Sequence, residues 1–106
     1  MLTQFRTYNL AVQFHHSCRV AKMPGYLKNQ LLRAASSIAL NLAEGSGKPT
    51  PRDQLRFYSI AMGSLRECQA ALDLAPVRSQ ALTSMADHLG ASLYRLCHAQ
   101  PRDQAD

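Results

Sequence analysis

The segment Pro51–Ala75 limits the fold most strongly, because it is apolar on two sides at helical spacing. Two series of apolar and small residues follow it: Leu55, Tyr58, Met62, Leu65 and Leu72, and then Phe57, Ala61, Ser64, Cys68, Ala71 and Ala75. Thr50 suits the N-cap, Pro51 the first helical position and Asp53 the third, an arrangement similar to a capping box. Pro76 ends the pattern. A helix that is apolar on two sides needs neighbours on both, so we expect this one to be central.

Three further stretches have helical periodicity: Gln4–Lys22, Leu27–Glu44 and Val77–His98. The breaks between the helices contain "MPGY", "GSGKPT" and Pro76, which supply the proline and glycine that end helices. Such short connections make consecutive helices antiparallel. The sequence therefore predicts an all-α fold, an antiparallel up-down-up-down four-helix bundle, with residues 1–106 as a single domain.

The composition fits a small globular protein rather than a disordered or membrane-spanning one. The chain has 106 residues, of which 46% are hydrophobic and 18% charged. Its three cysteines are far apart and form no C-x-x-C pair, which is typical of reduced thiols in a cytosolic protein. No apolar run approaches the about 18 residues of a membrane helix, and no secretion signal is recognisable. We expect a cytoplasmic chain that does not contact membranes.

The "GSGK" run after the second helical stretch looks like part of a phosphate-binding loop. Such a loop requires G-x-x-x-x-G-K-[ST] after a strand, because its backbone amides wrap the phosphates and its hydroxyl reaches the metal. Here the first glycine position is Leu42, the hydroxyl position is Pro49, and a helix precedes the loop. Nucleotide hydrolysis is therefore excluded. Instead, we expect Gly45 to be the left-handed C-cap of the helix.

A hairpin centred near residue 47 or 48 predicts which residues of its two helices face each other. In this register, facing residue numbers sum to about 95, so Glu44 lies near Arg52 and within a turn of Arg56. One of these arginines then holds Glu44, the alternative being a solvated carboxylate. The mid-helix Gly63 costs about 0.5–1 kcal/mol relative to alanine. We expect close approach of another helix, or of the Arg33 side chain, to explain it.

The segment Leu27–Ala75 also carries two sequence patterns. They read Q-[LI]-x-R-A-x-x-S-[IV]-x-x-N-[IL]-A-E-G and R-F-[LY]-x-I-A-x-G-S-L-x-E. Their polar, charged and glycine positions include Arg33, Asn41, Glu44, Gly45, Arg56, Gly63, Ser64 and Glu67. With these patterns the chain resembles bacterial four-helix-bundle proteins encoded within intervening sequences of large-subunit ribosomal RNA genes. Relatives of that family include the accessory variability protein of diversity-generating retroelements.

This resemblance implies a helical bundle that assembles into a ring, a pentamer, with no known catalytic activity. For the retroelement relatives it implies binding of nucleic acid and a reverse transcriptase through a basic ring surface. One departure from the pattern follows Glu67, where the family often has a second acid and this chain has Gln69 and Ala70.

The residues themselves indicate no catalytic or metal site. His15 and His16 are adjacent and point about 100° apart on a helix, and no H-x-x-x-H or E-x-x-H pair exists. The serines form no G-x-S-x-G elbow. We therefore expect no enzyme, no metal and no cofactor.

The candidate nucleic-acid contacts are basic residues with a net charge of +5 behind them. The candidates are Arg33, Lys48, Arg52, Arg56 and Arg66. Arg52 and Arg56 are one turn apart and Lys48 just precedes them, which is the best local cluster. Binding would involve backbone phosphates of RNA or DNA and not sequence. The alternatives are a solvated basic face and a protein-binding adaptor or scaffold without a nucleic-acid role.

Assembly would multiply this charge, and the sequence favours it. The two apolar series of Pro51–Ala75, the alanines flanking the second helix and Gly63 offer more small and apolar surface than four helices need. We therefore expect a homo-oligomer, with copies of the chain itself as the first partner. The alternative is that a single chain buries both series.

Overall fold

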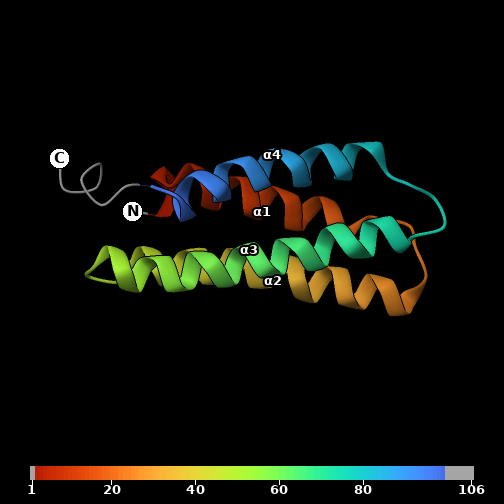
Figure 1. The fold of residues 1–106 in the computed structure, drawn as a ribbon. Helices are drawn as coiled ribbons and strands as arrows, with labels where there is room; N and C mark the ends of the chain where they lie inside the picture. Colours follow the sequence, from red (N-terminus) through yellow and green to blue (C-terminus); the bar gives the residue numbers. More distant parts are fainter. Residues whose placement is uncertain (1, 100–106) are drawn as a thin grey trace.

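Four antiparallel α-helices form the fold of this protein in a computed structural model, which describes residues 2–99. A short 3-10 helix η1 (Leu2–Gln4) precedes α1 (Arg6–Arg19), α2 (Gly25–Ser46), α3 (Pro51–Leu74) and α4 (Gln80–Cys97). In Figure 1 the helices run up and down along one long axis, with the α2–α3 turn at the same end as the start of α1. Helix α1 packs against α2 and α4, and α3 packs against the same two helices. The predicted all-α, up-down-up-down bundle is confirmed.

The helix ends follow their capping groups. The Thr50 hydroxyl accepts a hydrogen bond from the Asp53 amide at 3.2 Å, with Pro51 as the first helical residue, as predicted. Helix α4 begins at Gln80 rather than Val77, because the Ser79 hydroxyl accepts from the Leu82 amide at 3.2 Å and caps the helix there. Side-chain caps therefore fixed both starts.

Helix α1 is shorter than the predicted Gln4–Lys22 at both ends. Its last regular residue is Arg19, because the next two amides bond in a tighter turn, Val20 to the Ser17 carbonyl at 3.3 Å and Ala21 to Cys18 at 3.1 Å. At the other end, α1 begins only at Arg6, after η1.

The predicted role of Gly45 as a left-handed C-cap is wrong. Helix α2 continues to Ser46, and the cap is Gly47 with right-handed φ −89° and ψ −3°. No glycine in residues 2–99 has positive φ. The reason for glycine at position 45 is packing, because a Cβ atom there would lie 2.7 Å from Tyr58 Cε1 and 3.0 Å from Phe57 Cβ. Gly45 therefore lets α3 approach α2 closely.

The predicted register of the α2–α3 hairpin is also wrong, by more than a helical turn. The Ser37 and Ser64 hydroxyls hydrogen-bond at 2.8 Å, and the Cys68 thiol lies 3.9 Å from the Leu31 carbonyl. Facing residue numbers therefore sum to about 100 rather than 95. Because α2 runs past Glu44 to Ser46, the turn lies further along the chain than expected.

The core buries most of both apolar series of α3. Its fully buried large side chains come from all four helices: Phe14, Leu31, Ile38, Leu42, Leu65, Leu89 and Leu93. On α3 the buried residues are Tyr58, Ala61, Ser64, Leu65, Cys68, Ala71 and Leu72. Like every other helix, α3 has two packed neighbours. The two series therefore leave little apolar surface exposed to solvent. Any contact between copies must use other residues.

Two buried thiols make the stability of this core sensitive to alkaline pH. Burial raises the pKa of Cys18 and of Cys68 from 9.0 to about 12. Between these values the unfolded chain releases both protons and the native chain keeps them, so stability is full below pH 9 and falls as pH rises toward 12. We expect the free energy of unfolding to fall by up to about 1.4 kcal/mol per pH unit and per thiol.

Urea unfolding at a series of pH values measures this decrease. The double variant Cys18→Ala, Cys68→Ala removes both thiols and should flatten most of the dependence on pH above 9, leaving the contributions of Cys97 and Tyr58, whose pKa values burial also raises. Equal slopes in the wild type and the double variant would show that the thiols are not responsible.

Candidate subunit interface and basic surface

The outer side of the α2–α3 hairpin presents a stripe of exposed side chains, which we term the hairpin face. It consists of Tyr26, Arg33, Leu40, Ile60, Gly63, Glu67 and Leu74. These positions recur at helical steps on each helix, and the observed register pairs them across the hairpin. Tyr26 faces Leu74 at one end, Leu40 faces Ile60 further along, and Arg33 faces Glu67 between them. The face thus alternates apolar and charged groups along the bundle.

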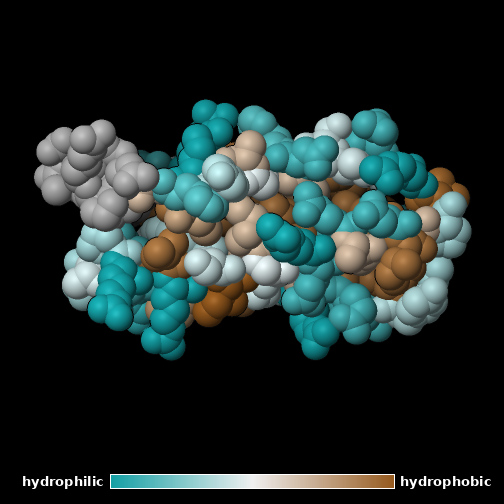
Figure 2. Space-filling model, viewed as in Figure 1, coloured by the Kyte–Doolittle hydropathy of each residue, from teal (hydrophilic) through white to brown (hydrophobic). Residues whose placement is uncertain are grey.

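The apolar members of the hairpin face are unusually open to solvent. The exposed fractions are 72% for Tyr26, 68% for Leu40, 45% for Ile60 and 70% for Leu74. Figure 2 shows apolar areas over the α2–α3 half of the molecule, separated by hydrophilic groups. Single exposed apolar residues are common, but several along one face are typical of a protein contact.

Gly63 lies in the middle of this face and has no explanation within one chain. A Cβ atom at this position would meet nothing within 4 Å, so no other helix approaches it. Arg33 does not approach it either, since its guanidinium donates to the Gln30 side-chain oxygen at 2.6 Å. Within one chain, neither predicted reason for Gly63 holds. Glycine makes the helix less stable than alanine would, and no contact within the chain compensates for this cost.

Polar residues beneath the face join the two helices. Asn41 donates its amide hydrogens to the Ser37 carbonyl at 2.9 Å and to the Ser37 hydroxyl at 3.1 Å. The same hydroxyl bonds to that of the buried Ser64. The Ser37–Ser64 bond therefore joins α2 to α3, and Asn41 orients the Ser37 side chain from within α2.

The charges near the turn are arranged differently from the prediction. Glu44 pairs with Lys48 at 3.1 Å and with neither Arg52 nor Arg56. Lys48 is four residues further along the same chain segment, so its ammonium reaches the carboxylate without crossing between helices. The predicted arginine partner of Glu44 is wrong.

The structure brings together three of the five basic candidates. Lys48 and Arg56 both lie over the Phe57 ring, with their cationic atoms 5.1 and 5.5 Å from its centre. Arg52 lies one turn before Arg56. We term Lys48, Arg52 and Arg56 the basic end. Within residues 2–99 only Lys48 of these forms an ion pair.

The other two basic candidates lie elsewhere. Arg33 belongs to the hairpin face and precedes Glu44 on α2 by about 16 Å of helical rise. Arg66 follows Arg52 on α3 by about 21 Å, four turns on, so the two lie on the same side of that helix. The five residues therefore do not form one patch.

Sequence reasoning missed an aromatic pair at the end of α4. The rings of Tyr94 and His98 stack with their centres 3.9 Å apart and an angle of 18° between their planes. Their spacing of four residues at a helix end was the available signal. Metal-ligand spacing concerns histidine only as a ligand, so it gives no sign that a histidine ring stacks on a tyrosine.

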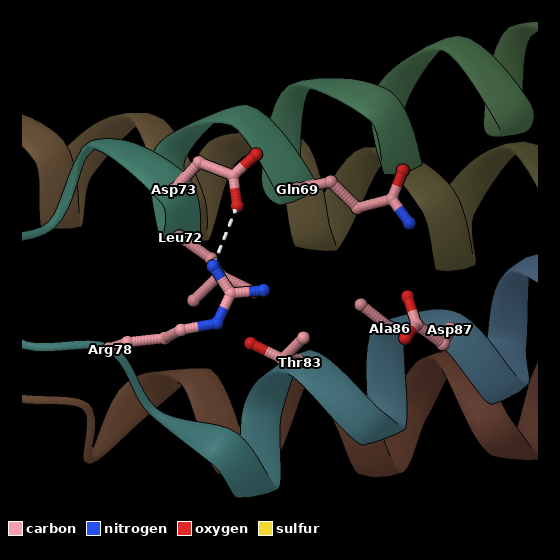
Figure 3. A pocket seen from close by; sticks show the side chains of 7 residues that line it. All are labelled: Gln69, Leu72, Asp73, Arg78, Thr83, Ala86 and Asp87. Atoms are coloured by element: carbon pink, nitrogen blue, oxygen red, sulfur yellow. Dashed lines mark hydrogen bonds and ion pairs between the residues drawn. The ribbon is translucent and has the colours of Figure 1, made fainter.

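A polar pocket of about 280 Å³ opens between α3 and α4, near their connection (Figure 3). It is lined by Gln69, Leu72, Asp73, Arg78, Thr83, Ala86 and Asp87. The Arg78 guanidinium turns toward Asp73 and pairs with it at 3.3 Å, while the Thr83 hydroxyl donates to the Ser79 carbonyl at 2.8 Å. In the described part of the chain no three histidine, cysteine or acidic residues gather to hold a metal. These bonds thus tie the connection to the end of α3 and fix the first turn of α4.

None of the helices in residues 2–99 combines the length and the apolar character needed to cross a membrane.

Comparison with known proteins identifies one family. The family model described as "23S rRNA-intervening sequence protein" matches residues 4–99, almost the whole of the chain. No curated protein and no solved structure gave a match. The match agrees with the two patterns in Leu27–Ala75, which the structure places on and beneath the hairpin face and beside the turn. The chain belongs to the 23S rRNA-intervening sequence protein family.

Proposed function

We propose that this chain is a non-enzymatic subunit of a homo-oligomer, with the hairpin face as the contact between copies. The observation that carries the proposal is the open position of Gly63 on the hairpin face. The other residues of this part of the face, Leu40, Ile60 and Glu67, have exposed side chains. A glycine lets another backbone come close, and the apolar groups beside it become covered when it does. A second copy of the chain explains both features together.

The charges of the hairpin face support a partner of the same sequence. Arg33 and Glu67 lie across the hairpin from each other, and neither forms an ion pair in residues 2–99. In a ring, the α2 edge of the face, which carries Arg33, can meet the α3 edge of the next copy, which carries Glu67, so the two edges are complementary in charge. For Arg33 we therefore propose pairing between subunits rather than phosphate binding. The ring of five implied by the family resemblance is the proposed stoichiometry.

We further propose that the assembly binds the phosphate backbone of RNA or DNA through the basic end and Arg66. Each chain carries +5, so five copies carry +25. Arg52, Arg56 and Arg66 are exposed and form no ion pair in the described residues. Unpaired guanidinium groups repeated around an assembly are suited to phosphates, which they contact without reading sequence.

Removing the arginines of the basic end should weaken binding to every nucleic acid by a similar factor. We expect the double variant Arg52→Ala, Arg56→Ala to lower the slope of log affinity against log salt by about 0.9 for each duplex phosphate that the protein no longer neutralises. Mobility shifts of labelled RNA and DNA at several salt concentrations measure this slope. The matched control is Arg19→Ala, which removes an exposed charge from the last residue of α1, at the end of the bundle away from the α2–α3 turn.

Two outcomes would contradict nucleic-acid binding at this surface. If the wild-type protein shifts neither RNA nor DNA at low salt, a protein-binding adaptor is the better account. If Arg19→Ala weakens binding as much per charge as the Arg52 and Arg56 changes do, the basic end is not the site.

A further inference from the structure

The aromatic pair at the end of α4 is exposed, although stacked rings are usually covered. Tyr94 retains 58% of its exposure and His98 is also exposed. Since each ring covers only one face of the other, the pair has an outer face on each side. A flat aromatic face is the surface that a nucleobase stacks on.

Hydrogen bonds hold this pair in place before any ligand arrives. The Tyr94 carbonyl accepts from the His98 backbone amide at 3.0 Å and lies 2.9 Å from His98 Nδ1. Because a carbonyl only accepts, Nδ1 carries the hydrogen in this contact. The imidazole orientation is thus fixed by its own helix end. A platform that is already ordered gives up little entropy when it binds.

A groove of about 430 Å³ with mainly apolar walls lies next to this pair. It is lined by Thr50, Pro51, Arg52, Leu55, Leu96, Cys97 and Ala99. Cys97 and Ala99 are the chain neighbours of His98, and Arg52 supplies the cation of the groove. Arg66 follows on the same side of α3. A stacking surface and an apolar groove therefore lie close together at the end of α4, and Arg52 and Arg66, which form no ion pair in residues 2–99, lie on the adjacent helix α3.

We propose that the Tyr94–His98 pair is a stacking platform for a base of single-stranded nucleic acid, with Arg52 and Arg66, about 21 Å apart along α3, contacting phosphates further along the same strand. The inference rests on the proposed nucleic-acid binding and names its substrate class. In a duplex the bases are stacked on each other and their faces are covered, so a single strand is the ligand that can use this surface. Phosphate contacts alone would not distinguish the two.

Substitution of Tyr94 separates stacking from charge. We expect Tyr94→Ala to bind a single-stranded oligonucleotide about 5- to 150-fold more weakly, which is the usual effect of removing the ring under one stacked base, and to bind a duplex as the wild type does. Tyr94→Phe keeps the ring and should keep the affinity. The matched control is His16→Ala, which removes an exposed imidazole from α1. Anisotropy titrations with labelled oligouridine, oligothymidine and a duplex of equal length give these affinities.

A single 2-aminopurine in the oligonucleotide tests the same contact in the wild-type protein. Stacking on an aromatic ring should quench its fluorescence on binding, and Tyr94→Ala should abolish the quenching. We expect the protein to bind oligouridine and oligothymidine with similar affinity, because neither a stacked base nor a phosphate contact requires the 2′-hydroxyl.

The failures can be told apart. If Tyr94→Ala binds single strands like the wild type while Arg52→Ala, Arg56→Ala does not, phosphate binding stands and the platform is wrong. An equal decrease in affinity for duplex and single strand, or a strong preference for RNA over DNA, also contradicts the platform. If the wild type binds no nucleic acid at low salt, both proposals fail.

Discussion

Replacing Gly45 by alanine should destabilise the bundle by about 1–3 kcal/mol, although alanine favours helices. The new Cβ would lie 2.7 Å from the Tyr58 ring, which cannot move freely because it is buried and packs against the Phe5 ring at 6.0 Å between centres. The α2–α3 contact must therefore open or the ring must shift. Urea unfolding followed by circular dichroism measures the change in stability.

The matched change at Gly63 should have the opposite sign in the separate chain. Gly63→Ala places its Cβ in open space and should stabilise the dissociated chain by about 0.5–1 kcal/mol. In the assembly the same methyl group lies in the proposed contact between copies and should weaken association. If Gly45→Ala proves neutral, the close approach at Tyr58 is wrong. If Gly63→Ala leaves association unchanged, no backbone of a second copy lies near that residue.

A single aspartate on the hairpin face should dissociate the assembly. In Leu40→Asp or Ile60→Asp, association would bury a carboxylate among apolar groups, which costs several kcal/mol at each contact. Both side chains are exposed in one chain, so the helical content and unfolding of the chain itself should change little. We expect each variant to elute from size exclusion as a subunit of 11.7 kDa.

The controls for this experiment are Val20→Asp and Val77→Asp. These valines are 80% and 76% exposed and lie outside the hairpin face, in connections at the opposite end from the α2–α3 turn. They should leave the assembly intact. Dissociation by all four variants would indicate a general effect of charge, and an intact assembly with Asp at 40 and at 60 would show that copies meet elsewhere.

The helices were predictable because their signals are local. Apolar periodicity marks each helix, and proline, glycine and the Thr50 hydroxyl mark where helices stop and start. The register of the hairpin was not predictable in this way, because it depends on which residue lies at the centre of the turn. When the turn moves by one residue, the sum of facing residue numbers changes by two, so the short extension of α2 beyond Glu44 misplaced every facing pair.

The functional surfaces were only partly predictable for the same reason. The one-turn spacing of Arg52 and Arg56 placed them together at once, since i and i+4 share a helix face. The roles of Gly45 and Gly63 depend on what lies across the hairpin, which the sequence does not state. The stack of Tyr94 on His98 depends on a bond from Nδ1 of His98, just beyond the regular helix, to the Tyr94 carbonyl, and periodicity carries no information about it.

The mass of the wild-type protein in solution tests the central claim most directly. Light scattering coupled to size exclusion should give a particle several times the 11.7 kDa of one chain, and five times that mass if the ring has five copies. The mass should be retained on dilution and should fall to that of one chain in the Leu40→Asp variant. A particle of 11.7 kDa at every concentration would contradict the account, because the open Gly63 and the exposed apolar groups beside it would then have no partner of their own kind.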